Sequence, residues 1–269
     1  TGHGGQTILI GETAPQGDRS QGVKRYVEAL TFVRALYCVG TDLKPLRGAP
    51  AGRLGCPGDA RSFRAANPAL FDAAGFAHHP YELLFAPSHV PRDRPNWVTL
   101  SSRGRLTRTL DRVLARHGVK RRMPLWLTEY GYQTNPPQAL APSFAKQAAW
   151  LNEAEYMSYR DPRVRGLAQF LLFDDGEPIA VTFQSGLMTI AGKPKPAYAA
   201  YRLPIFIPRG PRGRTMRVWG MLRPNAPGQA ATASLQYRRA GGSKWTTIRT
   251  VKTASSRGYL NVRVRRPAR

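Results

Sequence analysis

The stretch Pro124-Leu125-Trp126-Leu127-Thr128-Glu129-Tyr130-Gly131-Tyr132-Gln133-Thr134 decides the fold class. It is a short apolar run, limited by a proline and a glycine, that ends in the carboxylate of Glu129. Such a run is typical of a strand that is buried on both faces of a parallel sheet. Glu129 would then lie at the carboxyl edge of the sheet, where parallel α/β proteins place their chemistry.

A second segment, Thr7-Ile8-Leu9-Ile10-Gly11-Glu12-Thr13-Ala14-Pro15, has the same design and ends in Glu12. Taken singly, either glutamate could be an ordinary surface residue beside a turn. Two carboxylates at the ends of two buried strands are what a glycosidase needs, because one protonates the leaving oxygen while the other attacks the anomeric carbon or activates water. The pair therefore predicts glycosidase chemistry.

These segments resemble the clan of retaining (β/α)8 glycoside hydrolases that includes families 5 and 39. The resemblance covers roughly residues 6 to 204. It implies that Glu12 ends the fourth barrel strand as the acid/base and that Glu129 ends the seventh as the nucleophile. One departure is Gly11, which stands where the clan usually has an asparagine that binds the sugar 2-hydroxyl.

Other segments extend the resemblance. Gly75-Phe76-Ala77-His78-His79-Pro80-Tyr81 is similar to the clan's sixth-strand end, where a histidine and a tyrosine line the sugar site. The eighth strand would be residues 167–173, with phenylalanines where the clan often has tryptophan, and residues 192–202 resemble its closing helix. Alternation along a strand sends His78 and His79 to opposite faces. We expect His79, with Tyr81, to face the catalytic mouth.

The expected substrate contacts are His79, Tyr81, Trp97, Tyr132 and Gln169. Trp97 lies in a proline-rich loop, where it could stack on a sugar or pack inward as a loop anchor. The tandem histidines have no Asp, Glu or Cys at ligand spacing, so we expect no metal. The mechanism also needs no organic cofactor.

Residues 1–204 are the expected catalytic part, 205–214 a Pro/Gly/Arg-rich linker and 215–269 an incomplete β-sandwich. The sandwich is predicted from alternating strands near residues 216–220, 233–238, 245–249 and 259–263. It resembles the immunoglobulin-like or fibronectin-like modules of secreted hydrolases. Helical spacing predicts helices near residues 23–37, 62–73, 101–117 and 143–159.

The fold class is therefore α/β, a partial (β/α)8 barrel comprising strands four to eight, followed by the sandwich. A whole barrel takes about 250 residues, so we expect a fragment of a longer secreted enzyme, with little activity on its own. A complete small α/β domain is the alternative for the fold. A non-catalytic carbohydrate- or wall-binding protein on a degenerate barrel is the alternative for the function.

Cysteine and charge complete the expectations. Cys38 and Cys56 flank a Gly/Pro-rich loop and predict a disulfide in a secreted protein, although two separate buried thiols would give the same sequence.

The net charge of +25 comes from arginines scattered through every segment, without interleaved aromatics, so we expect no nucleic-acid partner. The sequence contains no apolar run of about 20 residues, which is the length that would predict a membrane span. The expected partners are an oligo- or polysaccharide and, through the sandwich, the cell wall.

Overall fold

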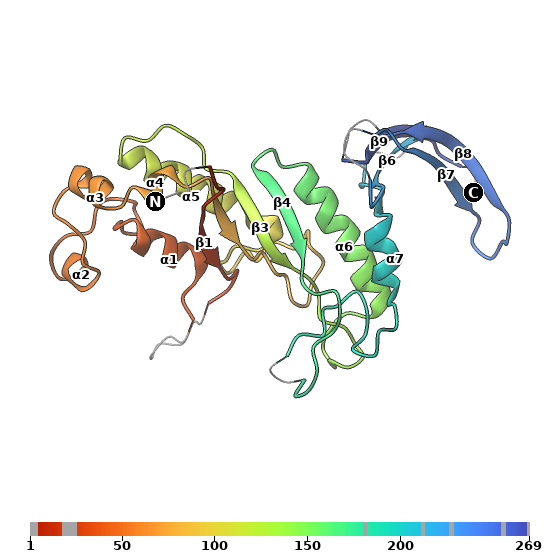
Figure 1. The fold of residues 1–269 in the computed structure, drawn as a ribbon, viewed down its shortest axis with the longest axis horizontal. Coiled ribbons are helices and arrows are strands. Elements are labelled where there is room, and N and C mark those ends of the chain that lie inside the picture. The colour runs from red at the N-terminus through yellow and green to blue at the C-terminus, as the bar shows by residue number, and fades with distance from the viewer. Residues whose placement is uncertain are drawn as a thin grey trace. The chain divides into compact units, whose positions relative to one another are not determined.

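The computed structural model of the chain describes residues 5–17, 26–179, 182–210, 213–225, 229–253 and 257–267 (Figure 1). The chain forms two compact units. The first comprises residues 1–132 and 157–170, and the second comprises residues 133–156 and 171–269. The expected boundary near residue 204 lies within the second unit.

A four-stranded parallel sheet organises the first unit, with the strands in the order β1, β2, β3, β4 (Figure 1). Their bounds are β1 Leu9–Thr13, β2 Gly75–His78, β3 Leu125–Tyr130 and β4 Val164–Gln169. Because all four strands are parallel, their carboxyl ends meet at one edge. Each glutamate is the penultimate residue of its strand, so both lie at this edge.

The strand numbering expected from the barrel resemblance is wrong at its first step. β1 is hydrogen-bonded directly to β2, with Leu9 opposite Gly75 and Gly11 opposite Ala77. A fourth and a sixth barrel strand cannot be neighbours, because the fifth lies between them. If β2 to β4 are the sixth to eighth strands, β1 takes the place of the fifth. The last strand is also shifted, to Val164–Gln169 from the expected residues 167–173.

Helices accompany this sheet: α1 Ala29–Leu36, α2 Gly48–Arg53, α3 Ala60–Ala66, α4 Ala69–Asp72, η1 Leu100–Ser102 and α5 Gly104–Arg116. The apolar stripes of α1 and α5 are buried at Val33, Leu110 and Val113, together with Phe76 and Leu125 of the sheet.

Two of the expected helices differ from the structure. α1 begins at Ala29, later than expected, and residues 23–25 of the predicted helix lie outside the described part of the chain. The helix expected over residues 62–73 is split at Asn67–Pro68, because a residue that precedes proline avoids the α conformation.

Cys38 and Cys56 form the predicted disulfide, with Cα atoms 5.7 Å apart. The bond closes the loop that contains α2, so the alternative of two separate thiols is excluded. Of the helices that the structure describes, none has both the length and the apolar character needed to cross a membrane.

In the second unit, α6 (Phe144–Tyr159) and α7 (Pro196–Arg202) match the expected helices. The C-terminal strands are β5 Ile205–Phe206, β6 Thr215–Met221, β7 Thr232–Arg238, β8 Trp245–Lys252 and β9 Tyr259–Arg265. They form two antiparallel sheets, β5-β6-β9 and β7-β8, which share a core of Val218, Leu235, Val251, Leu260 and Val264. The expected linker is partly ordered structure, since Ile205 and Phe206 pair with Gly220 and Trp219 of β6.

Candidate active site

An irregularity in β1 sets the position of Glu12. Gly11 pairs with Ala77 and Thr13 with His78, which leaves Glu12 without a partner in the ladder. Glu12 has a φ of 56°, in the left-handed region that non-glycine residues rarely adopt. Bulges of this kind re-aim side chains and are common beside active sites, as are strained backbone conformations.

Gly11 is required by the same irregularity. Its φ is 112°, and a Cβ atom there would lie 2.6 Å from the carbonyl oxygen of Ala77 and 2.7 Å from the Phe76 ring. No side chain fits at this position. The asparagine that the clan usually carries at this position is therefore excluded sterically.

His79, directly after β2, bridges the two glutamates. Its Nε2 contacts Oε2 of Glu12, and its Nδ1 lies 3.3 Å from Oε2 of Glu129. The carboxylates of two strand ends thus lie within reach of one imidazole ring.

Each of the two carboxylates also accepts a hydrogen bond from a hydroxyl group. The Thr128 hydroxyl donates to Oε2 of Glu12 at 3.0 Å, and the Tyr81 hydroxyl donates to Oε2 of Glu129 at 3.1 Å. Burial raises the pKa of the Tyr81 phenol, and the nearby charge of Glu129 adds to the effect. Tyr81 therefore stays protonated and remains a hydrogen-bond donor.

His78 has a different task from its neighbour. It is fully buried, with Nδ1 2.8 Å from the Thr13 hydroxyl and Nε2 2.8 Å from the Val98 carbonyl oxygen. Burial lowers the pKa of His78 to about 4. Its neutral ring ties the end of β1 to β2 and to the loop that precedes η1.

The three side chains of the site are partly exposed to solvent, which leaves them accessible to a small molecule. The side chains of Glu12, Glu129 and His79 are 54%, 34% and 19% exposed, respectively. Each carboxylate thus keeps hydrogen-bonding capacity that no protein group uses fully. The arrangement brings two carboxyl groups and an imidazole, side-chain types that serve in acid–base catalysis, to one partly exposed site.

The remaining predicted substrate contacts lie elsewhere in the first unit. Tyr132 is buried in the core, where its hydroxyl accepts from Tyr130 and donates to the Phe85 carbonyl at 3.0 Å. Gln169 ends β4 opposite Tyr130, at the same edge of the sheet. Trp97 lines a hollow of about 410 Å³, with the Arg94 guanidinium 5.0 Å from its ring centre.

Thr128 is a site residue that the sequence reasoning missed. Its position gave a signal, because it directly precedes Glu129 at the end of the same strand. Its contact with Glu12 depends on how β1 and β3 are placed around β2, which local pattern does not reveal. Among the residues that the structure describes, no group of three or more His, Cys, Asp or Glu side chains could hold a metal ion.

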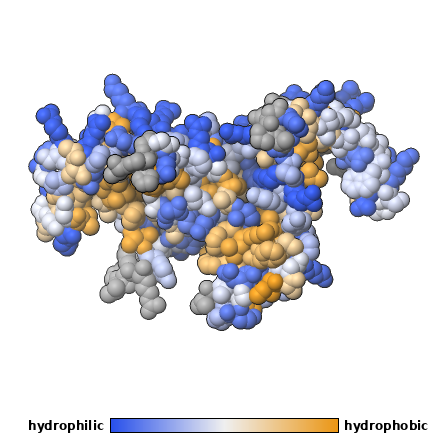
Figure 2. Space-filling view, viewed as in Figure 1, coloured by the Kyte–Doolittle hydropathy of each residue, from blue (hydrophilic) through white to orange (hydrophobic). Residues whose placement is uncertain are grey.

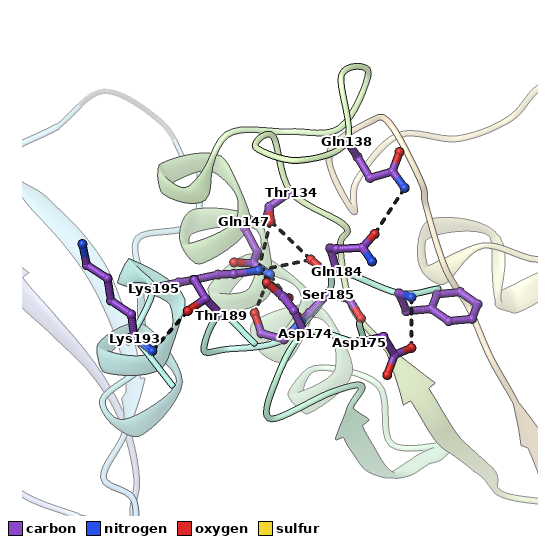
Figure 3. Close-up of polar contacts among 12 residues, drawn as sticks. Thr134, Gln138, Gln147, Asp174, Asp175, Gln184, Ser185, Thr189, Lys193 and Lys195 are labelled. Atoms are coloured by element: carbon purple, nitrogen blue, oxygen red, sulfur yellow. Dashed lines mark hydrogen bonds and ion pairs between the residues drawn. The ribbon is translucent and has the colours of Figure 1, made fainter. Parts of the chain in front are cut away.

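A second polar cluster lies within the second unit and is shown in Figure 3. The Lys195 ammonium donates to the Asp174 carboxylate at 2.7 Å, the Thr134 hydroxyl at 3.0 Å and the Gln184 carbonyl at 3.1 Å. The Lys195 and Asp174 side chains are only 1% and 8% exposed. Burial lowers the pKa of Lys195, and the contact with Asp174 opposes that shift. The cluster anchors the segment between β4 and α7.

No protein-family model matches the sequence, and no curated protein matches it. Among solved structures, the chain is similar to a family 39 glycoside hydrolase from Bacteroides cellulosilyticus WH2, with 17% identity and a TM-score of 0.40. That match covers 74% of this chain and 45% of the other. A second neighbour is the β-glucuronidase of Ruminococcus gnavus, with 16% identity, a TM-score of 0.32 and coverage of 48% and 21%.

The structural neighbours are thus glycoside hydrolases, and the chain spans less than half of their length. Likeness at this level does not establish an activity. Function has to be argued from the geometry at the ends of β1, β2 and β3.

Proposed function

We propose that this chain carries part of the active site of an O-glycoside hydrolase that retains anomeric configuration. The observation that carries the proposal is the single imidazole of His79, which has a strand-end carboxylate within reach of each nitrogen. Two carboxyl groups that contact one ring are close enough for a two-carboxylate mechanism, in which retaining enzymes use a separation of about 5 Å. Inverting enzymes need roughly 6.5–9.5 Å to admit a water molecule. The expected separation of about 5 Å stays a prediction.

Glu129 is the proposed nucleophile. It lies at the end of a regular strand, it is partly exposed, and it accepts a hydrogen bond from Tyr81. That bond and the contact with His79 orient one oxygen of the carboxylate that attacks the anomeric carbon. The other carboxylate oxygen remains available to the substrate.

Glu12 is the proposed acid/base. It is the more exposed of the two, and the bulge turns its side chain toward His79 and Thr128. In this role it protonates the leaving oxygen and later deprotonates the incoming water. The Nε2 atom of His79 is a group through which its proton can be exchanged.

The pairing of β1 with β2 favours a second role for Glu12. A strand that neighbours the His79 strand occupies the fifth barrel position, not the fourth on which the clan carries its acid/base. Glu12 would then hold His79 in place beside Glu129, and another carboxyl group would donate the proton. The two roles give different kinetics when Glu12 is replaced.

We further propose that the described sheet belongs to a (β/α)8 barrel of which it forms four strands, and that the β5–β9 module is appended to it. The substrate would be an oligo- or polysaccharide, cleaved without metal or organic cofactor in a secreted enzyme. The module would supply contact with the cell wall.

The function is tested by trapping the glycosyl-enzyme. The full-length protein is incubated with a panel of 2-deoxy-2-fluoro glycosides that carry a good leaving group, and the labelled peptide is found by mass spectrometry. We expect a label on Glu129, together with retained configuration of the product from the matching unmodified glycoside. A label on another carboxylate would refute the assignment of the nucleophile. Sugar binding without turnover of any aryl glycoside would instead support the carbohydrate-binding alternative.

A further inference from the structure

The acidic residues of this chain stop at Glu177. The 92 residues that follow carry 18 lysines and arginines and no aspartate or glutamate, so they account for 18 of the 25 net positive charges. Two of these cations pair with carboxylates of earlier segments, Arg223 with Glu155 and Lys195 with Asp174. For the rest, the part of the chain that the structure describes offers no carboxylate partner.

Three of these unpaired arginines share one face of the β5-β6-β9 sheet. Arg217 of β6 lies directly opposite Arg263 of β9, and Arg265 is opposite Thr215 on the same face. Opposed residues in an antiparallel pair have Cβ atoms about 4.5–5.5 Å apart, and like charges there destabilise the sheet. All three side chains are exposed. A sheet that keeps this repulsion without a countercharge is suited to an anionic ligand.

Neighbouring groups hold the arginines in place. The Arg217 guanidinium donates to Oδ1 of Asn261 at 3.0 Å. Arg249 of β8 donates to the Arg263 carbonyl oxygen at 3.3 Å, which ties β8 to the backbone of β9. The name arginine face is used below for Arg217, Arg263 and Arg265.

The surroundings of the arginine face are polar. The same side of the sheet offers the Thr215 hydroxyl and the Asn261 amide. On β7 and β8, the exposed positions are mostly hydroxyl, amide and cationic groups, with one exposed aromatic ring, Trp245. Figure 2 agrees, because the strands at the right-hand end are mostly white to blue. Single-stranded nucleic acid needs a row of stacking aromatics, and a membrane surface needs inserted apolar groups. The described strands of the module have no row of exposed aromatics, and their exposed large apolar side chains are the isolated Ile205 of β5 and Trp245 of β8.

We propose that the arginine face binds an acidic polysaccharide whose sugars carry carboxylates. Guanidinium groups bind carboxylates with two parallel hydrogen bonds, and the nearby hydroxyl and amide groups can bond to sugar hydroxyls. The choice of a polysaccharide over other polyanions rests in part on the proposed glycosidase function. The anion site itself follows from the sheet alone.

The test measures binding and not hydrolysis, so its failure is distinguishable from failure of the proposed function. The complete chain carrying Glu129→Gln is titrated with polygalacturonate and with a neutral glucan, in a low-salt buffer and again with added salt. We expect binding to polygalacturonate only, weakened by salt as displaced counterions require. Because hydrogen bonds to charged groups are worth about 1.4 kcal/mol or more each, Arg217→Gln with Arg263→Gln should weaken binding at least about tenfold.

The matched control is Arg239→Gln with Arg257→Gln. This variant removes two exposed arginines of the same module that lie outside the arginine face. Its binding should weaken less than about threefold. An equal loss in the two variants would overturn the proposal, because it would show that only net charge matters. Tighter binding to single-stranded DNA or to anionic lipid vesicles than to polygalacturonate would overturn the choice of ligand.

Thermal unfolding shows whether weaker binding of a variant results from loss of its folded state. Removing the opposed charges of Arg217 and Arg263 relieves repulsion, so the Tm of that double variant should be unchanged or higher. Binding that weakens only as far as the folded fraction falls would overturn the anion site.

Discussion

The chain contains two clusters in which one nitrogen-bearing side chain contacts acidic groups, and they differ in how fully the hydrogen-bonding capacity of that side chain is used. In the first unit, His79 lies between Glu12 and Glu129, and all three side chains are partly exposed. In the second unit, Lys195 places its ammonium group on three acceptors and is almost fully buried with Asp174 (Figure 3). An ammonium group has three donors, so the Lys195 cluster has none to spare. The His79 cluster keeps free carboxylate capacity at its surface.

The difference separates a structural network from a candidate site. A buried ion pair whose hydrogen bonds are complete fixes the conformation of the chain, and breaking it leaves a charge without compensation. A half-exposed set of carboxylates does little for folding, but it can exchange protons and reach a substrate. Replacing residues in the first cluster should therefore change turnover and leave stability alone, and replacing them in the second should do the reverse.

The largest effect is expected at Glu129. Glu129→Gly removes the proposed nucleophile and should lower turnover of every substrate by about 10⁴-fold or more, because a group that forms the covalent intermediate has no substitute. The free energy of unfolding should change by less than about 1 kcal/mol, since the side chain is partly exposed. Initial rates on aryl glycosides and urea unfolding measure the two quantities. Residual turnover above about a hundredth of the original would contradict the assignment.

Glu12 should give a smaller loss that depends on the substrate. General-acid help is worth about 10²–10⁴-fold, but only where the leaving oxygen needs a proton. Glu12→Ala should therefore impair alkyl glycosides most and activated aryl glycosides least. Added azide should restore turnover and give a glycosyl azide of retained configuration.

A different result would assign Glu12 the second role. Equal loss on activated and unactivated substrates, without azide rescue, would show that Glu12 positions His79 and is not the acid/base. In that case His79→Ala should reproduce the kinetics of Glu12→Ala. The strand pairing between β1 and β2 makes this comparison necessary.

Local patterns in the sequence located the strand ends well. The apolar runs before Glu129 and Glu12 predicted strands, and the structure has both in one parallel sheet. The spacing of His78, His79 and Tyr81 predicted which side chain would turn toward the carboxylates. These features depend on residues close together in the chain, which is why sequence alone carries them.

Features that depend on pairing between distant segments were not predicted. The direct contact of β1 with β2, the bulge that isolates Glu12 and the pairing of β5 with β6 each require a partner far away in the chain. Helices within residues 26–72 were predicted, but the chain order gave no sign that the strands on either side of them would pair directly. The arginine face is different, because the absence of acidic residues after Glu177 is visible in the sequence.

The Lys195 cluster should respond through stability. Lys195→Met leaves the buried Asp174 carboxylate unpaired and should lower the free energy of unfolding by about 3–5 kcal/mol. Adding Asp174→Asn removes that charge and should recover part of the loss. Urea unfolding followed by circular dichroism measures both variants. The turnover of the folded fraction should stay unchanged, and a selective loss of turnover would show that the cluster belongs to the active site.

The same contrast exists within the dipeptide His78-His79 and predicts the pH dependence of stability. His78 is buried and neutral, with a pKa of about 4, against about 6.5 in an unfolded chain. Between these values the unfolded chain binds the proton and the folded chain does not, so stability is complete above about pH 6.5 and falls as the pH approaches 4. The full loss is about 3 kcal/mol. His78→Asn should be less stable at pH 7 but should lack this part of the decline, whereas His79→Asn should keep it. Urea midpoints from pH 7 to pH 4 test the difference, and a decline that disappears in His79→Asn would reverse the roles of the two histidines.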